Sequence, residues 1–309
     1  ELHTSQGVGR LRTCPVDRHL PPTPALALVP APAPQPAASA PEPAPAPPPP
    51  SAPAPAPAAA SDVPESLFAV ELNKSMIQAI KSAAKEELRR VMMQERVAVS
   101  ATQKQRGAVI NKALKKARIS MIGQVKYKSF KDKKGVREDL VTCMSNVWRL
   151  FRDYAANIIQ TALGLCLPIS SQPGEEVAHK ATVVPELLKD LNFVHKLELD
   201  DDGIEQCRLL EADYFIEMII HVVWQKGLHE YIDLVKLNSA MALGRAAVHN
   251  ALKAHHTGRF DSVDASAKQF YDIYNSILEL IDRIRADPAL RARYKMLQQL
   301  IVTRGSRVH

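Results

Sequence analysis

Acidic and imidazole side chains late in the chain are the first candidates for chemistry. Glu217 and His221 are four residues apart, so on one helix they share a face, where a carboxylate beside an imidazole can transfer protons. His249 and His256 are seven residues apart, whereas helical metal sites place ligands three or four residues apart. A buried, hydrogen-bonded Glu-His pair inside a helical bundle accounts for the first pattern without any reaction. We favour this interpretation and assign no catalytic residue, metal or cofactor. An enzyme or metal-binding domain using His221, Glu217 and His249 is kept as an alternative.

A second acidic pattern resembles the start of a calcium-binding loop. Residues 198–203 place acidic side chains at the first, third and fifth positions and Gly203 at the sixth. Such a loop also requires an apolar residue at position 8 and a carboxylate at position 12, where the chain has Glu205 and Leu209. We therefore reject a calcium site and interpret the acidic run as the N-terminal flank of a helix that begins near Ile204.

Positive charge is concentrated in one block of the chain. The whole chain has a formal charge of +7, but residues 74–137 hold 18 basic and 4 acidic residues, whereas residues 138–309 hold 19 basic and 23 acidic residues. Backbone phosphates attract such a block without sequence specificity, and aromatic side chains can stack on exposed bases. The sequence therefore predicts nucleic acid or another polyanion as a partner. The candidate contact residues are Lys112, Lys115, Lys116, Arg118, Lys126, Tyr127, Lys128, Phe130, Lys131, Lys133 and Lys134.

The basic block also allows two structural interpretations. Its charge can belong to a solvated helix face, or it can pair with the acidic C-terminal part of the same chain. The run Lys115-Lys116-Ala117-Arg118 in addition fits the short form of a nuclear import signal, which leads to the hypothesis of a nuclear location.

Apolar side chains recurring at three- and four-residue steps predict the elements that carry these residues. A first helix is expected at 74–92, a second from about Ser100 to a break at Gly123, and a long third from Val136 to near Gly164. A surface loop is expected at 170–181, where Pro173-Gly174 is a turn signal, and Pro185 is expected to open a short helix. The remaining helices are expected at about 204–226, 237–256, 265–285 and 288–302.

No segment has the two-residue period of a strand, so the predicted fold class is all-α. We expect an irregular helical bundle of about five to eight helices, preceded by a disordered Pro/Ala-rich arm. Of the 23 prolines, 19 fall within residues 1–64, where they disfavour helix and leave little apolar surface to bury. The predicted division is a 1–64 arm, a 65–135 basic helical segment, a 136–303 helical domain and a 304–309 tail. A docking ligand for aromatic grooves is the alternative role of the arm.

Cysteine usage and hydropathy give expectations about location. The four cysteines are scattered, which is typical of reduced thiols and an intracellular setting. The strongest apolar run, 214–224, is about half as long as a bilayer requires, so no membrane span is expected. The chain begins with Glu rather than Met, so we treat it as a possible fragment.

Three stretches resemble a known family. They are Trp148 to Leu165, Val184 to His195, and Met241 to Phe260 followed by Phe270 to Tyr274. In order and spacing they resemble an uncharacterised all-helical domain of unknown function common in predicted proteins of basidiomycete fungi. The resemblance implies an all-helical fold behind a long disordered N-terminal region, and it implies no activity.

These features together favour an intracellular, non-enzymatic binding or scaffold protein that contacts nucleic acid non-specifically through its basic helical segment. The alternative is a helical protein–protein interaction or self-association module, in which the apolar surface of residues 65–98 docks a partner.

Overall fold

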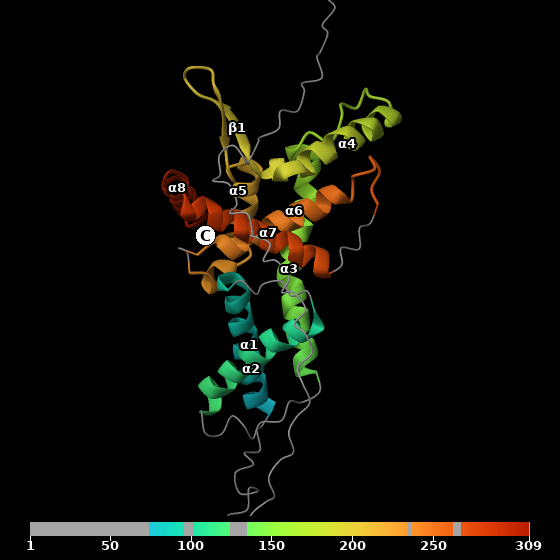
Figure 1. The fold of residues 1–309 in the computed structure, drawn as a ribbon. Helices are drawn as coiled ribbons and strands as arrows, with labels where there is room; N and C mark the ends of the chain where they lie inside the picture. The colour runs from blue at the N-terminus through green and yellow to red at the C-terminus, as the bar shows by residue number, and fades with distance from the viewer. Residues whose placement is uncertain (1–73, 96–101, 124–134, 234–235, 262–266, 309) are drawn as a thin grey trace, which may run out of the picture. The chain divides into compact units, whose positions relative to one another are not determined.

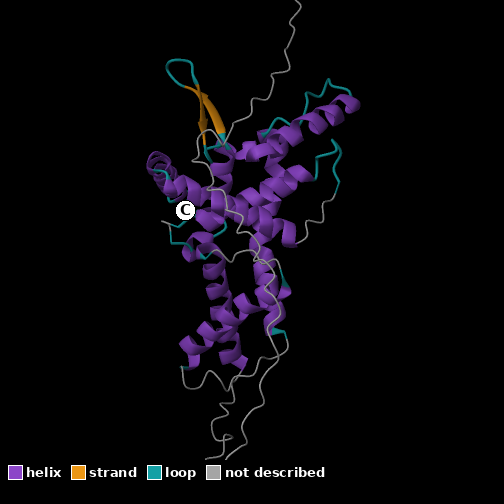
Figure 2. Cartoon of the chain, in the orientation of Figure 1, coloured by secondary structure: helices purple, strands orange, loops and turns teal. Residues whose placement is uncertain are grey.

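The computed structural model describes residues 74–95, 102–123, 135–233, 236–261 and 267–308 (Figure 1). Helices dominate these residues, and Figure 2 shows one small pair of strands among them. The eight α-helices of the described residues are α1 (Lys74–Gln94), α2 (Gln103–Ile122), α3 (Val136–Ala162), α4 (Pro173–Leu188), α5 (Asp213–Ile220), α6 (Asn238–Lys253), α7 (Ala267–Ala286) and α8 (Pro288–Gly305). Three short helical turns join them, η4 (Lys189–Val194), η5 (His221–Gln225) and η6 (Leu228–Tyr231). The all-α prediction is confirmed. The predicted Pro/Ala-rich arm lies outside the described residues.

Helices α1 and α2 form where the periodicity predicts them. The side chain of Thr102 accepts a hydrogen bond from the backbone N–H of Gln105, and the side chain of Gln105 accepts one from the backbone N–H of Thr102, so a capping box starts α2. Gly123 ends the helix at a φ of 78°, a conformation that glycine adopts without strain. The two helices pack together through their apolar faces.

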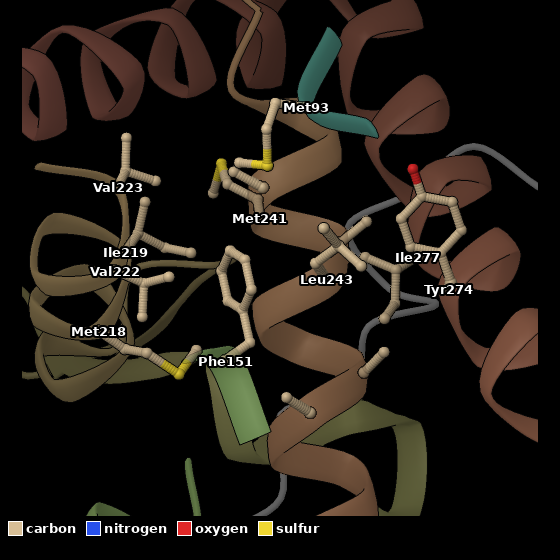
Figure 3. Packing of buried hydrophobic residues seen from close by; sticks show 14 of the residues in the cluster. Met93, Phe151, Met218, Ile219, Val222, Val223, Met241, Leu243, Tyr274 and Ile277 are labelled. Carbon is tan, nitrogen blue, oxygen red and sulfur yellow. The ribbon is translucent and has the colours of Figure 1, made fainter. Parts of the chain in front are cut away.

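Helix α6 lies at the centre of the fold. Every side chain from Ser239 to Val248 is buried, because α6 is covered by α3, α4, α5 and α7. Figure 3 shows Met241 and Leu243 of α6 between Phe151 of α3 and the α7 residues Tyr274 and Ile277. One hydrophobic cluster contains buried residues from α1 through α8, so the basic helices share their core with the bundle.

Helix α4 is longer than the sequence predicted. The expected loop is helical from Pro173 onward, and Pro185 lies inside the helix rather than at its start. Pro173 occupies the first turn, where a missing N–H costs nothing, and Gln172 and Glu175 form a capping box. Pro185 lies in the last turn of α4 and removes a single backbone hydrogen bond, which the packing of the buried Val184 and Leu187 offsets.

A β-hairpin replaces the start of the predicted 204–226 helix. Strands β1 (Lys196–Leu199) and β2 (Glu205–Arg208) pair antiparallel, with Lys196 opposite Arg208. The Asp200 carboxylate accepts hydrogen bonds from the N–H groups of Asp202 and Ile204 and thereby stabilises the connecting turn. The acidic run is therefore the turn of a hairpin and not a helix flank, and the helix begins only at Asp213.

Two expectations about location meet different outcomes. No α-helix within the described ranges is long and apolar enough to span a bilayer. Cys143 and Cys166 are free, but Cys207 is disulfide-bonded, so the prediction of reduced thiols is wrong at this residue. The spacing of cysteines along a chain does not determine which thiols the fold brings together, so cysteine usage does not support an intracellular location.

Candidate polyanion-binding surface

The four described candidate residues all lie on α2. Lys112, Lys115 and Lys116 are exposed and Arg118 is partly exposed. The opposite side of the helix is buried, as Ala113 with an exposed fraction of 0% illustrates. The other seven candidates, Lys126, Tyr127, Lys128, Phe130, Lys131, Lys133 and Lys134, lie outside the described residues. The structure therefore places a row of cations on one outward face of α2, which we call the α2 basic face (residues 112, 115, 116 and 118).

Carboxylates of α1 and of the residue after it pair with two of these cations. The Nζ atom of Lys112 lies 2.7 Å from a carboxylate oxygen of Glu95, and that of Lys116 lies 2.6 Å from a carboxylate oxygen of Glu87. Glu87 is buried and also accepts a hydrogen bond from Arg90. These two pairing partners therefore come from the basic block itself and not from the acidic C-terminal part.

These ion pairs leave the lysines accessible. The Lys112 and Lys116 side chains keep 58% and 61% of their surface exposed. The Lys112–Glu95 pair is exposed on both sides, and such pairs contribute only about 0–1 kcal/mol, so a phosphate can compete with Glu95 for Lys112. The described residues 74–95 and 102–123 hold 11 basic and 3 acidic side chains, a net charge of +8. The surface therefore remains strongly positive after the internal pairs are counted.

Glu217 and His221, the acid–base candidates, each have a structural partner. Glu217 forms an ion pair with Arg304 of α8, and the His221 ring lies 4.6 Å from the Tyr154 ring, measured between centroids. Burial, with a smaller contribution from the Glu217 charge, raises the pKa of Tyr154. The first contact joins α5 to α8 and the second joins η5 to α3, and the Glu217 and Arg304 side chains stay nearly half exposed.

The histidines of α6 and the turn after it do not gather around a common point. The His249 ring lies 6.3 Å from the Phe193 ring, and the His255 ring lies 5.4 Å from the Phe260 ring. Burial lowers the pKa of His249 to about 4, with smaller effects of nearby positive charges. Across the residues that the structure describes, no group of three or more His, Cys, Asp or Glu side chains is arranged to hold a metal ion.

Sequence reasoning missed a buried polar centre around Arg245. This arginine is 0% exposed, and its Nη2 atom donates a 3.4 Å hydrogen bond to the carbonyl oxygen of Leu191. Its Nε and Nη1 atoms find no partner in the described part of the chain, and burial lowers its pKa to about 9. The available signal was its position inside the apolar run 240–248, where an unpaired cation costs stability.

Comparison with known proteins gives a family but no activity. A family model described as a domain of unknown function (DUF6532) matches residues 83–284. The matched range begins within α1 and ends within α7, so it includes the α2 basic face. No curated protein and no solved structure matches the chain. The match confirms the predicted resemblance to an uncharacterised family, and function has to be argued from the contacts described above.

Proposed function

The chain belongs to the DUF6532 family of domains of unknown function, and we propose that it is a non-enzymatic binding protein whose α2 basic face contacts the phosphate backbone of nucleic acid. The exposure of Lys112, Lys115 and Lys116 on one face of a helix whose other face is buried carries this proposal. Lysine ammonium groups on a rigid helix meet phosphates as point charges and read no base sequence. We therefore expect non-specific binding that weakens steeply as salt is added.

Titration of labelled duplex DNA and single-stranded RNA into the full chain tests this proposal. The variant K112Q/K115Q/K116Q should bind more weakly than the native chain at about 50–200 mM salt. The slope of log affinity against log salt should become less steep by up to about 3, since each lost phosphate contact contributes roughly 0.9. The matched control K189Q/K226Q/K268Q removes three lysines that are also exposed, on η4, after η5 and on α7. Binding without salt dependence, or equal losses in both variants, would contradict the proposal.

The ion pair between Lys112 and Glu95 allows the complementary test. In E95Q the Lys112 ammonium loses its carboxylate partner and becomes available to phosphate. We expect several-fold tighter nucleic-acid binding with little change in stability, because the pair is exposed. The control E279Q removes one negative charge from an exposed position of α7, so it separates a local effect from a change of net charge. Equal gains in the two variants would speak against a contact at α2.

The same cations lead to the proposal of a nuclear location. If Lys115 and Lys116 form part of an import signal, a fluorescent fusion of K115Q/K116Q should leave the nucleus relative to the native chain. The docking alternative finds less support, since Ile80, Leu88 and Met92 of α1 are each 0% exposed and already packed within the chain.

A further inference from the structure

A second concentration of positive charge surrounds a pocket where α1, α6, α7 and α8 meet. The pocket has a volume of about 370 Å³ and is formed by the end of α1, the start of α6, the end of α7 and the first turns of α8. Four cationic side chains line it, Lys236, Arg285, Arg291 and Lys295. None of the described residues that line it is acidic.

Two of these cations are held by the protein itself. Lys236 pairs with Asp233 at 3.1 Å, and Arg291 donates hydrogen bonds to the carbonyl oxygens at the end of α7. Within the described residues, the side chains of Arg285 and Lys295 have no ion-pair partner. Asp282 is close enough to influence the pKa of Tyr294, but it does not line the pocket. At least two cations are therefore available to a ligand.

The polar wall of the pocket presents hydrogen-bond donors. The Oδ1 atom of Asn238 accepts hydrogen bonds from the Tyr294 hydroxyl at 2.8 Å and from Nε2 of Gln298 at 3.1 Å. These two bonds fix the orientation of the amide, so its NH2 group is left as a donor. Asn238 also begins α6, which has no acidic residue in its first turn and no side-chain cap. The positive end of α6 lies at the pocket together with the negative ends of α1 and α7, so the positive charge of the pocket comes from the four cations.

We infer that this pocket binds a small molecule that carries a di- or triphosphate group. Its volume lies at the lower end of the range of small-molecule sites and exceeds what a single phosphate needs. Arginine forks and lysine ammonium groups both suit phosphate oxygens, and a chain of phosphates carries enough charge for several cations. This inference uses α6, α7 and α8 and does not depend on the α2 basic face.

Calorimetric titration of the full chain with inorganic triphosphate tests the inference. R285Q/K295Q should bind at least ten-fold more weakly than the native chain, whereas the control K189Q/K268Q should bind as the native chain does. ATP and adenosine are titrated separately in parallel. If ATP binds and adenosine does not, the phosphates and not the nucleoside are recognised. Citrate is the third arm, and binding of citrate as tightly as triphosphate would overturn the assignment of a phosphate ligand.

Two further variants separate a specific loss of binding from a loss of folding and from binding at the α2 basic face. N238D keeps an acceptor for Tyr294 and Gln298 but places a carboxylate at the wall, so it should weaken triphosphate binding while unfolding at the native temperature. K112Q/K115Q/K116Q should keep native triphosphate affinity, which separates this site from the proposed nucleic-acid surface. Absence of triphosphate binding at millimolar concentration, or native affinity in both R285Q/K295Q and N238D, would refute the inference.

Discussion

His195 shows how a single polar residue is fitted into the apolar interior. It is 8% exposed, and its Nδ1 atom accepts a hydrogen bond of 3.2 Å from the N–H of Leu210. That bond requires a neutral imidazole, and it anchors Leu210, whose φ of 67° is unusual for a side chain of this kind. Burial, and then the charge of Arg245, lower the pKa of His195 to about 2. The residue therefore serves as a hydrogen-bond acceptor inside the fold.

The depressed pKa of His195 predicts a pH-dependent stability. The native pKa lies below the unfolded value of 6.5, so the unfolded chain takes up the proton first as the pH falls. The contribution of His195 to the free energy of unfolding should be fully present above pH 6.5. Below pH 6.5 it should decrease by about 1.4 kcal/mol per pH unit, down to the native pKa. In H195Q, which can keep an acceptor, the loss of unfolding free energy between about pH 7 and pH 5 should be smaller by about 2 kcal/mol. Urea unfolding at both pH values measures this.

The control for this prediction is H256Q, because His256 is exposed. It should lose as much stability over the same pH interval as the native chain does. A pH dependence in H195Q as steep as that of the native chain would show that His195 can be protonated without unfolding. His249, with a pKa lowered to about 4, should contribute a second decrease in the same interval.

Helix α8 shows how an element is fixed at both ends. The Asp287 carboxylate accepts hydrogen bonds from the N–H groups of Ala289 and Leu290, and Pro288 occupies the first turn. At the other end Gly305 packs its backbone against the Trp224 ring of η5. A Cβ atom at Gly305 would lie 2.3 Å from that ring. The start of α8 is therefore determined locally, whereas its end depends on close contact with another element.

The variant G305A tests the contact between α8 and η5. Because an indole ring is rigid, the added methyl must displace α8 or Trp224, and we expect a loss of about 1–3 kcal/mol of unfolding free energy. Thermal or denaturant unfolding measures the loss, and a change in tryptophan fluorescence should accompany it. The control G174A adds a methyl in α4, where nothing lies within 4 Å. A cost in G174A as large as that in G305A would contradict a specific clash.

For the molecule as a whole, the basic helices and the bundle share one core. The side chain of Gln94 donates a hydrogen bond to the carbonyl oxygen of Tyr231, and that of Arg89 donates one to the Tyr231 hydroxyl. The hydroxyl of Ser239 donates one to the carbonyl oxygen of Glu95. Buried side chains of α1 also belong to the same hydrophobic cluster as those of α6 and α7. We therefore expect α1 and α2 to unfold together with the later helices.

The variant L88A tests this expectation, because Leu88 of α1 is 0% exposed. Truncation of a fully buried leucine should lower the free energy of unfolding by about 2–5 kcal/mol. If the helices unfold together, this loss should apply to all of them and not to α1 and α2 alone. Circular dichroism follows all helices, whereas fluorescence follows Trp148 and Trp224, which lie in α3 and η5. Both transitions should shift to lower denaturant by the same amount.

A separate early phase in circular dichroism, with unchanged fluorescence, would show that the basic helices unfold independently. The control L199A truncates a hairpin leucine that is 64% exposed. It should change stability by less than about 0.5 kcal/mol.

Local patterns were sufficient to predict much of the fold. The apolar spacing of α1, α2, α3, α6, α7 and α8 predicts a helix wherever one face is buried, and Gly123 and Pro288 mark boundaries by their own backbone preferences. The same reasoning failed at Pro173 and at residues 196–208. The pair Pro173-Gly174 is compatible with a turn and with the start of a helix, so the local pattern does not distinguish them. The two strands within residues 196–208 have four residues each and are too short to show a two-residue period.

The sequence by itself determined where positive charge accumulates and that the fold is helical, because both depend on residue order alone. The tertiary structure decided which charges are available, because ion pairs depend on distance. Glu87 and Glu95 reach Lys116 and Lys112, while Arg285 has no such partner among the described residues. The pocket itself combines residues from 94 to 298, and only the packing of α1, α6, α7 and α8 brings them together.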